Sequence, residues 1–234
     1  MKILQMIGSV AIATSIATVA AIVSPVTANA ATFGFQNIIG GDNISGDTIV
    51  GQFKFDVTDV TDGAAGRTLW TFSNSTTTTS SASFISQIYF DWRSTASELS
   101  VNAFNSGNVG TVDFGSSFSG PDKLPQRTSI DFVTQLAIGS LSQGSGNGGI
   151  DLDEKLGVIF NSSSASVIEA AINSGDLRVG IHVQGIAVAG GRSDAYFSLP
   201  NTPTKPVPVP GFLLGVMAAG ALGSTRLLKK KQAA

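Results

Sequence analysis

Hydrophobic and polar residues alternate in short runs through the middle of the chain. The clearest run covers residues 177–184, where Leu, Val, Ile and Val alternate with Arg, Gly, His and Gln. A period of two, with Gly, Asn, Asp and Ser between the runs, is typical of antiparallel strands that have one buried and one wet face. About eight to ten such runs predict a mainly β fold, an antiparallel β-sandwich of jelly-roll-like type. Shorter runs of this kind occur at 52–57, 87–92, 99–103, 112–114 and 156–160.

One short helix is predicted to interrupt the strands. Ser164 or Ser166 can cap its start, and Gly175 is placed to end it. Two other stretches have low complexity: residues 73–83 are mostly Ser and Thr, and residues 142–149 are rich in Gly and Ser, which predicts a flexible loop. The apolar face of the helix is expected to consist of Val167, Ile168, Ala171 and Ile172.

The first thirty residues have the pattern of a secretory signal peptide. Lys2 precedes a long uncharged apolar stretch, and Pro25 then breaks it. The small residues Ala28 and Ala30 suit the two contact positions of a signal peptidase, so we expect cleavage after Ala30. A retained membrane anchor is the alternative interpretation, because the apolar run is long.

The C-terminal end predicts a membrane helix that follows a Pro-rich spacer at 200–210. Residues 211–225 are uncharged, and extending the helix to 228 by letting Arg226 reach the interface gives a span of roughly 27 Å. The tail at 229–234 begins with Lys229, Lys230 and Lys231. Positive charge stays on the cytoplasmic side, so the folded body, predicted at 31–199, is expected outside the cytoplasmic membrane.

One face of this predicted helix carries only small residues. They recur every fourth position, which allows another helix to approach closely. This face is expected to dock a membrane enzyme or a second copy of the chain, although small residues are also generally frequent in membrane helices. The residues of this docking face are Gly211, Gly215, Ala219 and Gly223.

The box Val207-Pro208-Val209-Pro210, the Gly/Ala/Leu helix and the basic end stand in a fixed order. Together they resemble the PEP-CTERM sorting domain, in which the usual box is Val-Pro-Glu-Pro and Val209 replaces the Glu. The stretch at 174–186 is also similar to PEP-CTERM proteins of cyanobacteria. The resemblance implies recognition by an exosortase-type membrane enzyme in a bacterium with an outer membrane, and an association with exopolysaccharide and biofilm matrix.

Composition narrows the possible chemistry of the body. The chain has no cysteine, which excludes disulfides, thiolate catalysis and Cys-ligated metal sites. Nine basic and sixteen acidic residues fall between 31 and 206, so the exported part has a net charge of −7. Such an acidic charge balance is unlike that of nucleic-acid-binding proteins, which carry basic patches, and it disfavours direct binding of polyanions. No cofactor is expected.

His182 is the only histidine of the chain. The alternation predicts that it lies on the polar face of its strand, as an ordinary surface residue. A catalytic histidine would need a nucleophile and an orienting carboxylate nearby, and the chain has no G-x-S-x-G motif.

Two acidic groups are candidates for a calcium site, because carboxylate oxygens suit this ion. One is Asp151, Asp153 and Glu154, and the other is Asp42, Asn43 and Asp47. Neither has the offsets of an EF-hand, so we expect solvated loop acids and no metal site.

Three functions from different classes remain open. The preferred one is a non-enzymatic surface or extracellular-matrix protein. A carbohydrate-binding module would need an exposed aromatic platform, for which Tyr89 and Trp92 are the candidates, although the alternation places Trp92 in the core. A secreted hydrolase would need a cleft with paired carboxylates, or His182 beside a Ser and an Asp.

Overall fold

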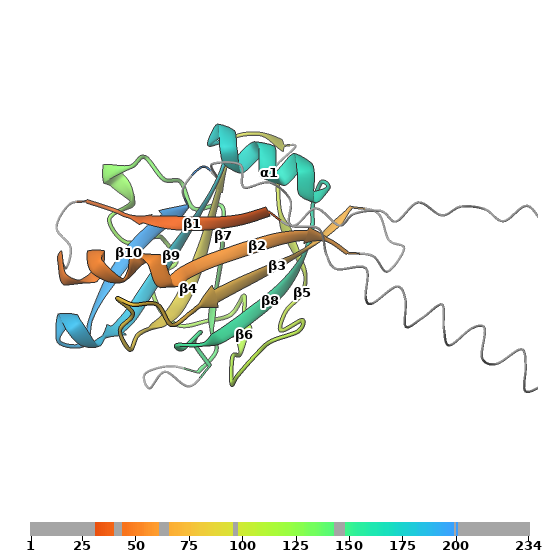
Figure 1. The fold of residues 1–234 in the computed structure, drawn as a ribbon. Coiled ribbons are helices and arrows are strands. Elements are labelled where there is room, and N and C mark those ends of the chain that lie inside the picture. The colour runs from red at the N-terminus through yellow and green to blue at the C-terminus, as the bar shows by residue number, and fades with distance from the viewer. Residues whose placement is uncertain are drawn as a thin grey trace, which may run out of the picture.

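The computed structural model describes residues 31–39, 44–60, 66–95, 98–142, 148–198 and 200, and within them ten strands form one antiparallel sheet (Figure 1). The strand order is β5-β8-β3-β2-β1-β10-β9-β4-β7-β6. The mainly β, antiparallel prediction is therefore confirmed. The strands are β1 (Ala31–Asn37), β2 (Phe53–Asp59), β3 (Arg67–Asn74), β4 (Phe84–Trp92), β5 (Ser100–Ala103), β6 (Phe114–Gly115), β7 (Leu136–Ser140), β8 (Glu154–Asn161), β9 (Leu177–Ile186) and β10 (Arg192–Ser198).

The sheet curls until its two halves face each other. Strand β1 belongs to both halves, because its first part pairs with β2 and its last part pairs with β10. Four strands separate β3 from β4 in the sheet order, yet the Trp70 ring of β3 meets the Phe90 ring of β4 edge-on at 5.7 Å. Phe90 also lies 5.2 Å from Phe160 of β8. The main hydrophobic core consequently lies between the halves, where the alternating residues of the strands meet.

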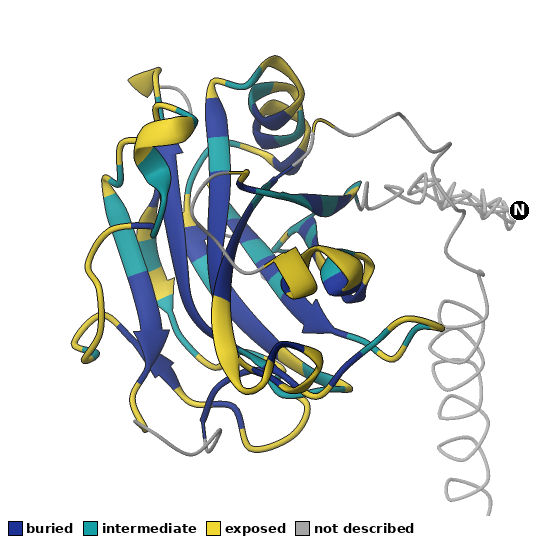
Figure 2. Ribbon diagram, turned by 90° about the vertical axis from the view of Figure 1, so that its left-hand side faces the viewer, coloured by how far each residue is buried: buried dark blue, intermediate teal, exposed yellow. Residues whose placement is uncertain are grey.

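The helix α1 (Ala165–Ser174) covers one end of this core, with its buried side turned inward (Figure 2). Gly175 ends it with φ of 80°, as predicted. The start differs from the prediction: no serine side chain caps it, and Asp59 at the end of β2 accepts a 2.7 Å hydrogen bond from the Ala165 backbone N–H. Ile168 and Ile172 are buried, but Val167 is 43% exposed, so its assignment to the apolar face is wrong.

The described residues also include the 3-10 helices η1 (Ile44–Gln52), η3 (Arg127–Ser129) and η4 (Ala187–Ala189). In the described part of the chain no helix is long and apolar enough to cross a bilayer. The predicted signal peptide, the sorting box, the transmembrane helix at 211–228 and the basic tail lie outside the described residues.

The expectation of one wet face is wrong for β4 and β9. Residues 116–135 fold over the outer face of these strands and build a second, smaller core that contains Tyr89, Leu124 and Phe132. The Arg178 guanidinium holds this layer in place: it pairs with Asp91, lies over the Phe132 ring and donates a 2.7 Å hydrogen bond to a backbone carbonyl of the layer. Because both faces of β4 are covered, the alternation of that strand does not report exposure.

The Ser/Thr-rich stretch at 73–83 builds an ordered, buried polar network. Asn74 donates a 2.8 Å hydrogen bond to the Ser83 carbonyl and accepts one of 2.7 Å from the Gln52 amide. Gln52 in turn accepts from the Ser81 backbone N–H. Buried polar groups need hydrogen-bond partners inside the protein. By supplying them, this network joins the end of β3 to η1 and to the start of β4.

Candidate functional site

Two irregularities in neighbouring strands meet at one corner of the sheet. Strand β4 shifts register between Ile85 and Gln87, and the β9–β10 pair shifts register between Arg192 and Asp194. In the second case Gly185 of β9 has φ of 66°, a conformation that favours glycine. Such bulges redirect side chains and interrupt pairing, and they are frequent beside functional sites.

His182 lies at this corner and is buried, with 8% of its surface exposed, which corrects its predicted surface position. Its Nδ1 is 2.6 Å from the Gln87 Oε1, and the Ser86 hydroxyl lies 2.8 Å from the same oxygen. An amide oxygen only accepts, so Nδ1 donates its proton to Gln87. Burial lowers the pKa of His182 to about 4.

This cluster does not have the arrangement of a Ser–His hydrolase. The Ser86 Oγ is 3.5 Å from the His182 Nδ1, a nitrogen that already bonds Gln87. The Gln184 Nε2 lies 3.4 Å from the same Nδ1, and no carboxylate among the described residues bonds the ring. A general base needs a free nitrogen near its nucleophile and a pKa near the working pH, and His182 offers Ser86 neither.

A surface groove of about 530 Å³ opens beside this cluster. The half-buried Phe84 ring forms its apolar part, and Gln184 connects it to His182. Sequence reasoning missed this groove, because register shifts bring its residues together from three strands; the only available signal was the Gly190-Gly191 pair after a strand. The lining residues are Phe84, Gln184, Gly185, Gly191, Arg192 and Ser193.

The carboxylates of Asp153 and Glu154 hold neighbouring loops. Asp153 accepts hydrogen bonds from the backbone N–H and the hydroxyl of Thr76, at 2.8 and 2.7 Å, and these bonds lower its pKa. Glu154 accepts from the Thr111 and Asp151 backbone N–H groups at 2.8 and 3.0 Å. Burial and the nearby charge of Glu154 raise the pKa of Asp151.

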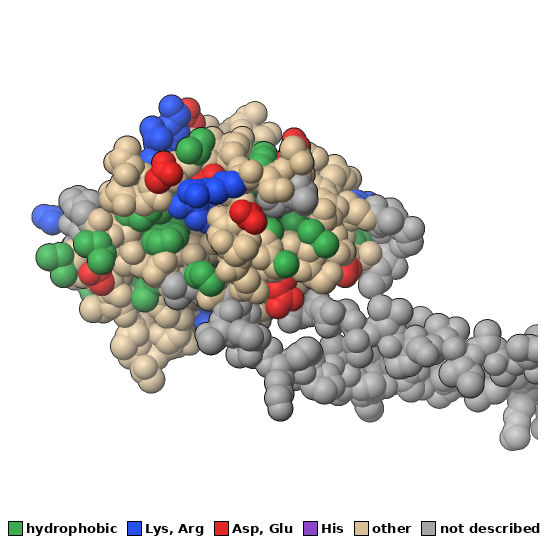
Figure 3. All heavy atoms as spheres, turned by 90° about the horizontal axis from the view of Figure 1, so that it is seen from above, with side chains coloured by type: hydrophobic (Ala, Val, Ile, Leu, Met, Phe, Trp, Pro, Cys, Tyr) green, Lys and Arg blue, Asp and Glu red, His purple; other side chains and the backbone are tan. Residues whose placement is uncertain are grey.

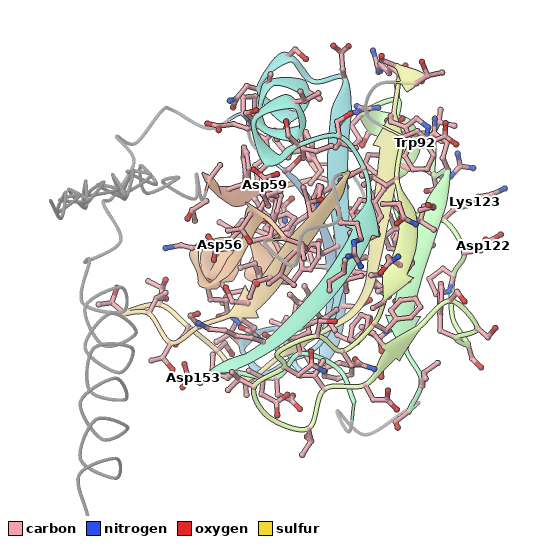
Figure 4. All side chains as sticks on the ribbon, turned by 90° about the vertical axis from the view of Figure 1, so that its right-hand side faces the viewer. Asp56, Asp59, Trp92, Asp122, Lys123 and Asp153 are labelled. Carbon is pink, nitrogen blue, oxygen red and sulfur yellow. The ribbon has the colours of Figure 1, made fainter. Side chains whose placement is uncertain are left out.

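The described residues contain no group of three side chains suited to hold a metal ion. Of the second acidic candidate, Asp47 lies in η1, while Asp42 and Asn43 fall outside the described residues. Asp153 lies at the opposite end of the molecule from Trp92 (Figure 4).

Tyr89 does not provide the aromatic platform considered above. It is fully buried, its hydroxyl donates a 2.9 Å hydrogen bond to the Pro121 carbonyl, and burial together with the charge of Asp122 raises its pKa. Trp92 is half-buried against the main core, in line with the prediction from alternation. Every aromatic side chain that the structure describes is buried or half-buried.

A second, shallower hollow of about 340 Å³ lies where the end of β8 meets the β4–β5 connection, and it is lined only by polar side chains. On the face seen from above α1, side chains of both charges and hydrophobic side chains are scattered among the other atoms (Figure 3). That face offers no broad patch of one charge. The lining residues of the second hollow are Thr95, Glu98, Ser100, Asn161, Ser162 and Ser163.

In comparisons with known proteins, no family model, no curated protein and no solved structure matches the chain.

Proposed function

We propose that this chain is a non-enzymatic, exported surface or extracellular-matrix protein, delivered by a C-terminal sorting signal of the PEP-CTERM type. The observation that carries the proposal is the order of the Pro box at 207–210, the apolar segment at 211–228 and the basic tail at 229–234. An apolar segment followed at once by lysines suits a membrane helix with its end at the cytoplasmic face.

The position of the folded body within the chain supports this proposal. Strand β1 begins at Ala31, the first residue after the expected cleavage point, and β10 ends at Ser198, just before the Pro-rich spacer. Phe35 pairs with Ser198 in antiparallel register, so the body begins and ends at the same end of the sheet. A body anchored through its C-terminus would therefore turn its opposite end, with η1 and η4, away from the membrane.

We also propose that the curled sheet is a β-sandwich of jelly-roll-like type. The ring contacts of Phe90 with Trp70 and Phe160 support this, because they cross from one half of the sheet to the other. The two layers share β1 in this description.

The state of His182 supports a role without catalysis. The ring is buried, neutral at physiological pH and hydrogen-bonded to the Gln87 amide oxygen. A hydrolase would need this histidine to be oriented by a carboxylate and to face an accessible nucleophile.

Signal peptidase, the export machinery and an exosortase-type enzyme are the proposed partners, with the small face Gly211, Gly215, Ala219 and Gly223 as the docking surface.

Intact-mass measurement of the chain recovered from the cell envelope and from the medium tests this proposed delivery. We expect a mature chain that begins at Ala31. After processing, its mass should be lower than that of residues 31–234, because part of the C-terminal segment is removed. Replacing Gly215 and Ala219 with Leu should preserve insertion and block processing. Recovery of an exported chain that still begins at Met1 would contradict the proposal.

A further inference from the structure

The groove beside the register shifts of β4 and β9 combines an apolar surface with polar and charged groups. Its apolar surface comes from Phe84 at the start of β4, and its polar groups come from Gln184 in β9 and from Arg192 and Ser193 in β10. Ligand sites in proteins typically pair such an apolar surface with a few polar groups that fix orientation, in volumes of roughly 300–1,000 Å³. The 530 Å³ groove falls within this range.

The Phe84 ring is fixed between two glycines. A Cβ added to Gly149 would come within 2.7 Å of the ring, and one added to Gly185 within 3.1 Å. Glycine at both positions therefore lets the ring approach the backbone closely, while its remaining surface lines the groove. A ring held in this way presents a rigid apolar face at low entropic cost to binding.

Arg192 is the cation of this groove. Its side chain is exposed, and it has no hydrogen-bond or ion-pair partner among the described residues. A guanidinium donates two parallel hydrogen bonds to a carboxylate, which makes arginine the usual residue for planar anion recognition. The neighbouring Gln184 amide and Ser193 hydroxyl can both donate and accept hydrogen bonds from ligand hydroxyl groups.

We propose that this groove binds a saccharide unit that carries one carboxylate, such as a uronic-acid residue. One face of the sugar ring packs on Phe84, the carboxylate binds Arg192, and the hydroxyl groups bond Gln184 and Ser193. The exported part of the chain has a net charge of −7, which repels dense polyanions at long range. The ligand is therefore a short oligomer, or a polymer in which acidic units are widely spaced.

The inference rests on the proposed function in one respect, because an extracellular location gives the body access to such polymers. The proposed function and the groove proposal can be contradicted independently of each other. Fractionation and intact mass test delivery in cells, whereas equilibrium binding to the purified full chain in mild detergent tests the groove.

Calorimetric titration with a trimer of galacturonic acid, and with the matching trimer of galactose, is the direct test. We expect the acidic trimer to bind with a dissociation constant in the micromolar to millimolar range, and the neutral trimer to bind more weakly. Arg192→Gln should weaken binding of the acidic trimer by roughly ten- to a hundredfold and leave the neutral trimer unchanged, because one charge-assisted pair is lost. Phe84→Leu should weaken both.

Two control variants match these changes elsewhere in the molecule. Lys123→Gln removes one exposed positive charge, and Phe118→Leu trims another half-buried ring that packs on a glycine, Gly139. Both should bind like the unmodified chain. Equal binding of the two trimers, an Arg192→Gln chain that binds normally, or no detectable binding of the acidic trimer would each overturn the proposal. Melting curves of every variant separate loss of binding from loss of fold.

Discussion

Gln87 and His182 stand opposite each other on β4 and β9, joined by a 2.6 Å hydrogen bond between Oε1 and Nδ1. Protonation of the His182 ring would place a positive charge in a buried site. The groups that face it, Gln87, Ser86 and Gln184, are all neutral, and Arg192 of the adjoining groove is itself a cation.

This pairing makes stability depend on pH. Burial lowers the folded-state pKa of His182 from 6.5 to about 4, so between these values the unfolded chain binds the extra proton. The stabilisation is complete above pH 6.5 and is lost as the pH falls towards 4. At pH 5 we expect the free energy of unfolding to be lower by about 2 kcal/mol than at pH 7.5. Denaturant titration across this range measures it.

The matched variant is His182→Gln, which keeps a polar side chain and cannot titrate. Because His182 is the only histidine, the loss between pH 7.5 and 5.5 should disappear in this variant, whatever its absolute stability. An unchanged pH slope in the variant would contradict the assignment to His182.

Asn74 is expected to be the most sensitive polar residue of the Ser/Thr-rich stretch. Its side chain bonds the Gln52 amide and the backbone carbonyls of Ser83 and Ile150, all away from water. Asn74→Ala removes one hydrogen bond from each of these buried groups and should lower the free energy of unfolding by roughly 3 kcal/mol. The exposed Thr78→Ala is the control and should change it by less than about 0.5 kcal/mol. Equal effects of the two substitutions would show that the network does not stabilise the fold.

Calcium should leave the melting temperature unchanged, because the Asp153 and Glu154 carboxylates bond loop groups instead of converging. A bound ion would raise the melting temperature by mass action. Scanning calorimetry with and without millimolar calcium measures this. A large rise that Asp151→Asn and Asp153→Asn abolish would contradict the prediction and establish a metal site.

Alternation along the chain predicts strands well where one face meets the core. The run at 177–184 corresponds to β9, and the run at 52–57 corresponds to β2 with a shift of one or two residues at its ends. It fails to describe the outer face of β4 and β9, because residues 116–135, which cover that face, have no period of their own. His182 looked exposed for this reason.

The groove was beyond reach of sequence reasoning for a different physical cause. Phe84 and Arg192 line one groove because β4 and β10 both pair with β9, and pairing register between distant strands cannot be deduced from local periodicity. The helix cap is a similar case, since Asp59 reaches Ala165 from a strand more than a hundred positions earlier.

We expect residues 211–234 to sort the protein and to be unnecessary for the fold. Among the described residues, the buried members of the main core and the second core fall within 33–196, and residues 31–206 are acidic where the tail is apolar and then basic. Reversing the charge of Lys229, Lys230 and Lys231 should weaken retention in the envelope, because in the proposed topology these charges would hold the helix end at the cytoplasmic face.

Deleting residues 211–234 and measuring the cell fraction, the mass and the melting curve of the product tests this claim most directly. We predict a folded, soluble chain that begins at Ala31, melts cooperatively and leaves the cell-envelope fraction. A truncated chain that aggregates would show that the tail belongs to the fold, and one that stays in the envelope would show that the tail does not anchor the protein.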